Sequence, residues 1–237
     1  MSELKRLHVI ILAFSYQDCG VSIAPLPGCL VDIQRALYWC VRRQAKYEIL
    51  TDLSPESYSQ RLATLAPEYR YVPTLTHVTS KQVLVEKLQS LSFDGPVVLY
   101  YSGHFKHEQM LINREESYPI QEVIRLLLSR LREASSKLTL IFDCCYPSTL
   151  DLPYTYDGKN KLTGGKNWLL HSVLLLTAAA TSQQSMSTNF GSPFTLLWSQ
   201  APTLEEFLQA SAGKQHRTYA SFPVKLSEWS HLNIDSQ

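Results

Sequence analysis

The sequence places a histidine and a pair of cysteines directly after two runs of apolar residues. Residues 96–101 (PVVLYY) lead through a serine and a glycine to His104, and residues 138–142 (LTLIF) lead through an aspartate to Cys144 and Cys145. A thiolate is a strong nucleophile, and a neighbouring imidazole can take the proton of the thiol. Because successive strand residues face opposite sides, at most one of the two cysteines can face His104 while the strand continues. The pattern indicates nucleophilic chemistry by a cysteine and a histidine.

A purely structural explanation of the same residues stays open. Free cysteines are among the most buried residue types, so Cys144 and Cys145 could belong to the core while His104 caps a loop. Against this, both groups follow the ends of apolar strands. In open parallel sheets, ligands bind beyond the carboxyl ends of the strands. A histidine and a cysteine that leave adjacent strands at this edge could therefore meet at one substrate.

Short apolar runs alternate with amphipathic segments, which is the pattern of a mostly parallel sheet with helices on its faces. We expect strands at residues 7–14, 47–50, 96–101, 138–142, 172–177 and 219–226. We expect helices at residues 29–43, 81–91 with Thr79 as N-cap, 120–132 and 193–212. Residues 54–76 predict a loop with a short helix, and residues 147–167 predict a mobile loop. The predicted fold is α/β, with one domain over residues 1–237, three layers and about six strands.

Composition narrows the classes of function. The 237 residues include 22 basic and 21 acidic ones, a balance that gives no field for recruiting nucleic acid or an anionic membrane. The five cysteines form no CxxC pair, which argues against a disulfide framework or a zinc site. No stretch reaches the roughly 20 apolar residues of a membrane span. We expect a soluble monomer without cofactor or metal, in the reducing cytoplasm or the nucleus, that binds neither nucleic acid nor membranes.

Four segments in the right order resemble the metacaspases, which are caspase-like cysteine peptidases. Residues 100–104 (YYSGH) resemble the family's YSGHG segment, and residues 143–145 (DCC) resemble its D-x-C segment. Upstream, residues 28–32 (GCLVD) resemble the G-C-x-N-D motif that opens the first helix. Downstream, residues 176–180 (LTAAA) and 191–195 (GSPFT) resemble the late strand and helix. The histidine precedes the second cysteine by 41 residues, near the ~50 residues of caspase-type sequences.

The resemblance implies a three-layer caspase-like fold and a role for each matched residue. His104 would be the general base and Cys145 the nucleophile, while the backbone N–H groups of Phe105 and Cys145 would stabilise the oxyanion. The likeness also assigns four residues to the pocket for the side chain before the cleaved bond (the S1 pocket): Cys29, Asp32, Ser102 and Asp143. Two carboxylates beside a hydroxyl suit a guanidinium or an ammonium group. Cleavage after Arg or Lys follows, rather than after Asp as in animal caspases. The alternative for Asp32 is a first-turn acid that the helix dipole favours.

The sequence departs from the family pattern beside both reactive groups. The residue after the histidine is usually glycine, and here it is Phe105, which would be strained at a positive φ. Displaced oxyanion donors can cost roughly 10²–10³ in rate. After Cys145 the chain reads Tyr146-Pro147 instead of His-Ser, and the proline removes a possible N–H donor.

Calcium-dependent metacaspases use several aspartates near the histidine and the cysteine. Here the region 107–120 contains only the acids Glu108, Glu115 and Glu116, whereas calcium takes about six to eight oxygen ligands. Glu115 and Glu116 read as a solvated turn. We therefore predict no calcium requirement.

Two functions from different classes remain. The first is an active endopeptidase specific for Arg or Lys, whose family resemblance suggests a role in regulated cell death or stress signalling. The second is a catalytically impaired homologue that works by binding partners. An unrelated doubly wound hydrolase or nucleotide-binding protein is disfavoured, because neither GxSxG nor GxxxxGK[ST] occurs. An active enzyme could also cut its own loop 147–167, at the basic residues Lys159, Lys161 or Lys166.

Overall fold

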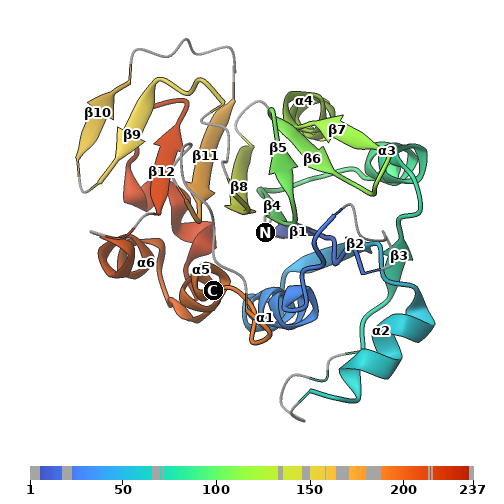
Figure 1. Cartoon of the computed structure of the whole chain (residues 1–237). Coiled ribbons are helices and arrows are strands. Elements are labelled where there is room, and N and C mark those ends of the chain that lie inside the picture. Colours follow the sequence, from blue (N-terminus) through green and yellow to red (C-terminus); the bar gives the residue numbers. More distant parts are fainter. Residues whose placement is uncertain are drawn as a thin grey trace.

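The centre of the fold is a twisted sheet that, within the described residues, has nine strands in the order β10-β9-β12-β11-β8-β4-β1-β2-β3 (Figure 1). The computed structural model describes residues 6–17, 23–65, 70, 72–132, 136–145, 150–157, 159–163, 171–179, 188–212, 214 and 216–234. The six strands from β11 to β3 are parallel to one another, whereas β12, β9 and β10 pair antiparallel. The bounds are β1 (His8–Ala13), β2 (Lys46–Thr51), β3 (Leu75–His77), β4 (Val97–Ser102), β8 (Lys137–Asp143), β9 (Tyr154–Tyr156), β10 (Asn160–Leu162), β11 (Ser172–Thr177) and β12 (Arg217–Ala220).

Helices cover both faces of this sheet (Figure 1). One face carries α1 (Cys29–Arg42), α2 (Pro55–Leu62), α5 (Pro193–Gln200) and α6 (Leu204–Ser211), followed by a 3-10 helix at Leu226–Leu232. The other face carries α3 (Lys81–Ser90), α4 (Ile120–Arg130) and a small antiparallel sheet of β5 (Phe105–Lys106), β6 (Gln109–Leu111) and β7 (Ser117–Pro119). The predicted α/β class, with a mostly parallel sheet between helices, is confirmed.

The apolar runs form strands because their side chains can be buried on both faces. In β4 the neighbours Tyr100 and Tyr101 point into opposite cores: Tyr100 packs with the α1 face and Tyr101 with the α4 face. Every residue of β4 is buried, which is the normal state of a central parallel strand. Full burial of one large apolar side chain stabilises a fold by about 1.5–3 kcal/mol, so these central strands hold the carboxyl edge of the sheet firmly in place.

The sheet has more strands than the six or so expected, nine within the described residues. Residues 147–167 were expected to form a mobile loop, but their described part contains the hairpin of β9 and β10, and β9 pairs with β12 and extends the sheet. The strand β3 also lies in a stretch expected to be a loop with a short helix. All three strands have only three residues, and β10 is exposed throughout, so none of them shows an apolar run.

Three element boundaries also differ from the expectation. The segment 193–212 is two helices, since α5 ends before Pro202 and α6 begins at Leu204. The N-cap of α3 is Ser80 and not Thr79, because the Ser80 side chain accepts a hydrogen bond from Val83 N–H. The last strand is residues 217–220, and the chain after it turns into the 3-10 helix.

Candidate active site

His104 and Cys145 leave two neighbouring strands at the same edge of the sheet. β4 and β8 are paired in parallel, and their last matched residues are Ser102 and Asp143. Just beyond this pair, the N–H of Gly103 donates to the carbonyl oxygen of Asp143 at 3.4 Å. His104 and Cys145 each follow two residues after the matched pair, so the carboxyl edge holds both reactive groups.

The imidazole of His104 is held by the backbone of the segment before α1. Its Nε2 lies 2.6 Å from the carbonyl oxygen of Ala24. A carbonyl oxygen only accepts, so Nε2 carries the proton and Nδ1 is left as the basic nitrogen. The ring also packs on the ring of Tyr16, with 4.8 Å between the centroids. This arrangement fixes both the tautomer and the orientation that a general base requires.

Tyr16 holds the backbone of His104 by a hydrogen bond, and Asp52 in turn holds the backbone of Tyr16. The Tyr16 hydroxyl accepts from the backbone N–H of His104 at 3.0 Å and donates to the carbonyl of Leu111 at 2.7 Å. The Asp52 carboxylate accepts from the N–H groups of Ser15 and Tyr16, at 2.7 and 2.6 Å. These bonds stabilise a left-handed backbone at Tyr16, where φ is 54°. Our sequence reasoning missed this support, although Tyr16 and Asp52 follow the ends of β1 and β2.

The two cysteines differ in exposure. Cys144 is 2% exposed and packs in the α4-side core, and burial raises the pKa of its thiol well above the usual range, with the charge of Asp143 adding to the effect. Cys145 is partly exposed. Of the pair, Cys145 is therefore the thiol that a reagent or a substrate can reach.

Asp32 and Asp143, the two acids expected in the S1 pocket, lie close together near the carboxyl edge of the sheet. Asp143 accepts a hydrogen bond from the hydroxyl of Thr195 at 2.6 Å, and the Tyr100 hydroxyl lies 2.6 Å from the same Thr195 oxygen. Asp32 is 1% exposed. Burial raises the pKa of Asp32 well above its usual range, and the nearby charge of Asp143 raises it further. A cation placed between the two carboxylates would stabilise the charged form of Asp32 and so lower its pKa.

Asp32 already has partners within the chain. Its Oδ1 accepts from the backbone N–H of Ser192 at 2.8 Å and lies 3.7 Å from Nη1 of Arg35, one helical turn further along α1. That Nη1 also donates to the Ser192 carbonyl at 3.3 Å. Gly191 lies so close that a Cβ there would be 2.5 Å from Asp32 Oδ1, and its φ is 82°. The sequence reasoning did not identify Arg35 as a neighbour of this acid.

The remaining residues expected in the S1 pocket are buried at the same edge. Cys29 begins α1, and burial raises the pKa of its thiol well above the usual value. Ser102 ends β4 and is also buried. Cys29 and Asp32 thus lie in the first turn of α1, and Ser102 and Asp143 lie at the ends of β4 and β8, two residues before His104 and Cys145.

Comparison with known proteins gives one significant relative in sequence. Metacaspase-3 of Trypanosoma cruzi (strain CL Brener) is 35% identical over 160 residues, which are 59% of this chain and 40% of that protein. Over these residues the chain is similar to a metacaspase. It matches less than half of the length of this curated relative. No family model matches the chain.

Solved structures match the chain at low sequence identity. Protein GSU0716 from Geobacter sulfurreducens has a TM-score of 0.57 at 11% identity, covering 96% of this chain and 97% of its own. Caspase-1 from Spodoptera frugiperda has a TM-score of 0.48 at 12% identity, covering 83% of this chain and 69% of its own. The likeness to protein GSU0716 supports the fold alone.

Phe105 does not have the strained backbone that the comparison with glycine suggested. It lies in β5 and is absent from the positive-φ residues of the described chain. Its side chain is 5% exposed and contacts the rings of Tyr101 and Phe142, at 6.4 and 6.1 Å between centroids. The phenyl ring is thus a core group in this protein. Tyr146 and Pro147 lie outside the described residues.

One of the acids after the histidine, Glu116, is used inside the fold. Glu116 does not belong to a freely solvated turn, because its carboxylate accepts from the Lys81 N–H at the start of α3 and from the Asn113 amide, at 3.0 and 2.9 Å. Across the part of the chain that the structure describes, no group of three or more His, Cys, Asp or Glu side chains could hold a metal ion.

The lysines expected to be cut by the enzyme itself lie in different settings. Lys159 is exposed in the turn between β9 and β10. Lys161 is part of β10, and its ammonium group pairs with Asp157. Lys166 lies outside the described residues.

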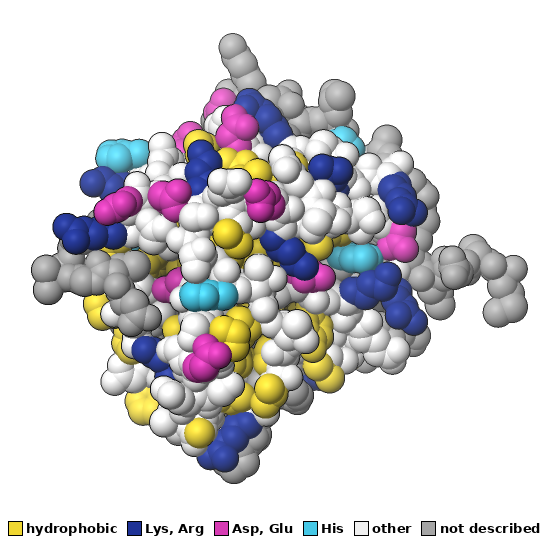
Figure 2. Space-filling model, turned by 90° about the vertical axis from the view of Figure 1, so that its right-hand side faces the viewer, with side chains coloured by type: hydrophobic (Ala, Val, Ile, Leu, Met, Phe, Trp, Pro, Cys, Tyr) yellow, Lys and Arg dark blue, Asp and Glu magenta, His cyan; other side chains and the backbone are white. Residues whose placement is uncertain are grey.

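Basic and acidic side chains are interspersed on the face shown in Figure 2. None of the described helices combines the length and the apolar character needed to cross a membrane.

Proposed function

We propose that this metacaspase-like chain is a cysteine endopeptidase that cleaves after Arg or Lys, with Cys145 as nucleophile and His104 as general base. The observation that supports it best is the pair of neighbouring strands, β4 and β8, that end in register immediately before these two residues. The tautomer that Ala24 sets on His104 gives the proposal its chemistry, because it leaves Nδ1 free to take a proton.

The reaction would proceed by acyl transfer. His104 Nδ1 takes the thiol proton of Cys145, and the thiolate attacks the carbonyl carbon of the scissile peptide bond. The backbone N–H groups of Phe105 and Cys145 would stabilise the resulting oxyanion. As the bond to nitrogen breaks, the imidazolium returns the proton to the leaving amine. Water then hydrolyses the thioester, again with His104 as base, and the free thiol is restored.

The preference for a basic residue rests on the acid pair. A substrate guanidinium or ammonium group would lie near Asp143 and Asp32, with Ser102 and Cys29 lining the same end of the sheet. Two carboxylates so close together and so deeply buried favour a neighbouring cation. An anionic side chain such as Asp would be repelled there. We further propose a single domain that acts as a monomer without calcium, in regulated cell death or stress signalling.

One experiment tests this proposal directly. Fluorogenic peptides ending in Arg, Lys or Asp are offered to the wild type, Cys145→Ala and Cys144→Ala, each with and without calcium. The wild type and Cys144→Ala should cut the Arg and Lys peptides at similar rates in both conditions, and Cys145→Ala should cut none. Better cleavage of the Asp peptide would contradict the pocket assignment, and equal rates in Cys145→Ala would contradict the nucleophile.

The second candidate is a catalytically impaired homologue that binds partners. Two observations favour it. The Asp32 carboxylate already interacts with Arg35 and with the Ser192 N–H, and Phe105 is found where the family has glycine. This candidate predicts no hydrolysis of any of the three peptides by the wild type, combined with measurable binding of Arg or Lys peptides.

A further inference from the structure

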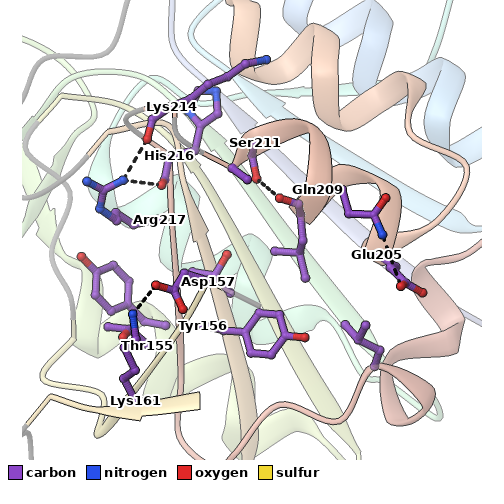
Figure 3. A pocket seen from close by; sticks show the side chains of 15 residues that line it. Thr155, Tyr156, Asp157, Lys161, Glu205, Gln209, Ser211, Lys214, His216 and Arg217 are labelled. Atoms are coloured by element: carbon purple, nitrogen blue, oxygen red, sulfur yellow. Dashed lines mark hydrogen bonds and ion pairs between the residues drawn. The ribbon is translucent and has the colours of Figure 1, made fainter. Parts of the chain in front are cut away.

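A cavity lies between α6 and the strands β12, β9 and β10 (Figure 3). Its volume is about 850 Å³. Neither His104 nor Cys145 lines it. Apolar and aromatic groups such as Leu208 and Tyr219 share its walls with charged groups. Its charged lining residues are Asp157, Lys161, Glu205, Lys214 and Arg217.

The charges of this cavity are not balanced. Lys161 is paired with Asp157, and Glu205 accepts from the amide of Gln209 at 3.3 Å (Figure 3). Lys214 and Arg217, in contrast, have no carboxylate within ion-pair distance in the described part of the chain. Because Glu205 keeps its charge when it accepts from an amide, the lining carries three cations and two carboxylates, an excess of one positive charge that favours an anionic ligand.

The backbone holds the guanidinium of Arg217 in place. Its Nη1 donates to the carbonyl oxygens of Lys214 at 2.9 Å and His216 at 2.8 Å (Figure 3). These two bonds use both hydrogens of Nη1. An arginine has five N–H donors, so three remain on Nε and Nη2. Their fork geometry matches the two oxygens of a carboxylate.

His216 lines this cavity and also contacts residues outside it. Its Nδ1 lies 2.8 Å from the Ala178 carbonyl, and its ring contacts Phe194 at 5.0 Å between centroids. Burial lowers the pKa of His216, while Asp143 acts on it in the upward direction and Lys214 and Arg217 in the downward direction. The charges of the cavity's cations and of Asp143 thus act on the same imidazole, with burial as the largest influence on its pKa.

The strands give the distance between the two sites. Arg217 begins β12 opposite Thr177, the last residue of β11, and β11 lies next to β8. Two strand spacings of about 4.8 Å separate the ends of β8 and β12, or about 10 Å. An extended peptide covers about 3.3 Å per residue, so the two sites are about three residues apart along a bound peptide.

We propose that this cavity is a second substrate subsite, which binds the carboxylate side chain of an Asp or Glu two to four residues from the basic residue of a peptide. The inference rests on the proposed function, because it takes the basic residue to lie at Asp143. A side chain of a polypeptide suits the cavity better than a small inorganic ion, since the volume is large and apolar groups lie beside the cations. Binding at both sites would select peptides that carry a basic and an acidic residue at this spacing.

A binding experiment tests the subsite without any need for cleavage. Fluorescein-labelled peptides with one Arg and one Asp, two to four residues apart on either side, are titrated onto Cys145→Ala and compared with peptides that carry Asn instead of Asp. We expect about three- to tenfold tighter binding of the best Asp peptide at low salt, the range for an accessible but well-oriented charge pair. Equal binding of every Asp and Asn pair would overturn the inference.

Variants of the two cations identify the cavity as the source of the preference. In the Cys145→Ala background, Lys214→Gln with Arg217→Gln should remove the Asp preference, and Arg217→Lys alone should retain part of it. The matched control is Arg125→Gln on α4, an exposed arginine on the opposite face, which should leave the preference unchanged. If the double variant unfolds, Lys214→Gln alone serves, and a preference that survives it undiminished would overturn the inference.

The kinetic experiment separates the subsite from the proposed activity. If wild type cuts Arg peptides, kcat/KM should rise three- to tenfold with Asp at the preferred position, and an unchanged value would overturn the subsite while leaving the peptidase intact. If wild type cuts nothing, a retained Asp preference in binding would support the subsite although the proposed activity is wrong.

Discussion

The carboxylate of Asp32 and the backbone N–H of Ser192 are joined by a 2.8 Å hydrogen bond across 160 residues of sequence. Ser192 is also the N-cap of α5, where its hydroxyl accepts from Phe194 N–H at 3.1 Å. This cap sets the start of the helix that carries Thr195, the hydrogen-bond donor to Asp143. Asp32 therefore has a structural task, the positioning of α5, as well as the proposed task of attracting a substrate cation.

Replacing Asp32 with alanine should destabilise the protein by about 2–4 kcal/mol, because the buried Ser192 N–H loses its acceptor and the Arg35 guanidinium loses its carboxylate partner. Asp32→Asn keeps an oxygen for Ser192 and should cost less. Urea unfolding measures both free energies. An alanine variant as stable as wild type would contradict the positioning role.

The same carboxyl should make stability depend on pH. Burial, and then Asp143, hold the pKa of Asp32 above its usual range, so the folded state keeps a proton that the unfolded state releases. The contribution of Asp32 is present below about pH 4 and is lost as the pH rises toward the raised pKa. Asp32→Asn should remove this decline in the free energy of unfolding. Asp94→Asn is a control of opposite sign, because His8 lowers the pKa of that exposed carboxyl. An unchanged slope in Asp32→Asn would refute the assignment.

Tyr16→Phe should lower kcat/KM on Arg peptides about tenfold and stability by about 1–2 kcal/mol. The change leaves the His104 N–H and the Leu111 carbonyl without partners, and small displacements of a catalytic group are costly. Tyr38→Phe, on the exposed side of α1, is the matched control and should change neither quantity. Loss of stability without loss of activity would make Tyr16 a purely structural residue.

The elements around the site were predictable where local sequence decides them. The strands β1, β4, β8 and β11 were expected within one or two residues, because a continuous run of apolar residues needs burial on both faces. The strands β9 and β10 were not, since a three-residue polar strand acquires its structure only from the neighbour with which it pairs. Pro202 also separates two helices that a periodicity count joined into one.

Contacts across the sequence explain the rest of the difference. His104 and Cys145 follow the ends of two neighbouring parallel strands. Their position at one edge of the sheet could therefore be predicted from the sequence pattern. Tyr16 lies 88 residues from His104, and Arg35 approaches Ser192 over 157 residues. No spacing rule links such pairs, because only the folded sheet brings the segments together.

Phe105→Gly restores the residue usual in metacaspases and should nevertheless destabilise this protein by about 3–5 kcal/mol. The phenyl ring is packed against Tyr101 and Phe142, so its removal leaves a cavity. Phe105→Leu fills most of that space and should cost less. Urea unfolding and peptide hydrolysis measure both variants. A glycine variant of full stability and higher activity would show that the ring hinders the oxyanion site instead of supporting the core.

Alkylation should distinguish the two adjacent thiols. Iodoacetamide at neutral pH should label Cys145 well before Cys144, because the latter is buried and its pKa is raised. Cys29 and Cys40 are buried with raised pKa values and should also stay unlabelled in the native protein. Peptide mapping by mass spectrometry locates the label. Faster modification of Cys144 would reverse the assignment of the nucleophile.

If the protein processes itself, the first cut should follow Lys159 and not Lys161. Lys159 is exposed in the turn of the β9–β10 hairpin, whereas Lys161 is paired with Thr155 in the strand ladder and its ammonium group is held by Asp157. A protease needs an accessible segment that can extend into its cleft, and loop tips meet this need best. N-terminal sequencing of aged wild type should find a new end at residue 160, absent from Cys145→Ala and from Lys159→Gln but present in Lys161→Gln. Fragments that are the same in Cys145→Ala would come from a contaminating protease. A wild type that hydrolyses peptides yet stays whole would be an enzyme active as a single chain.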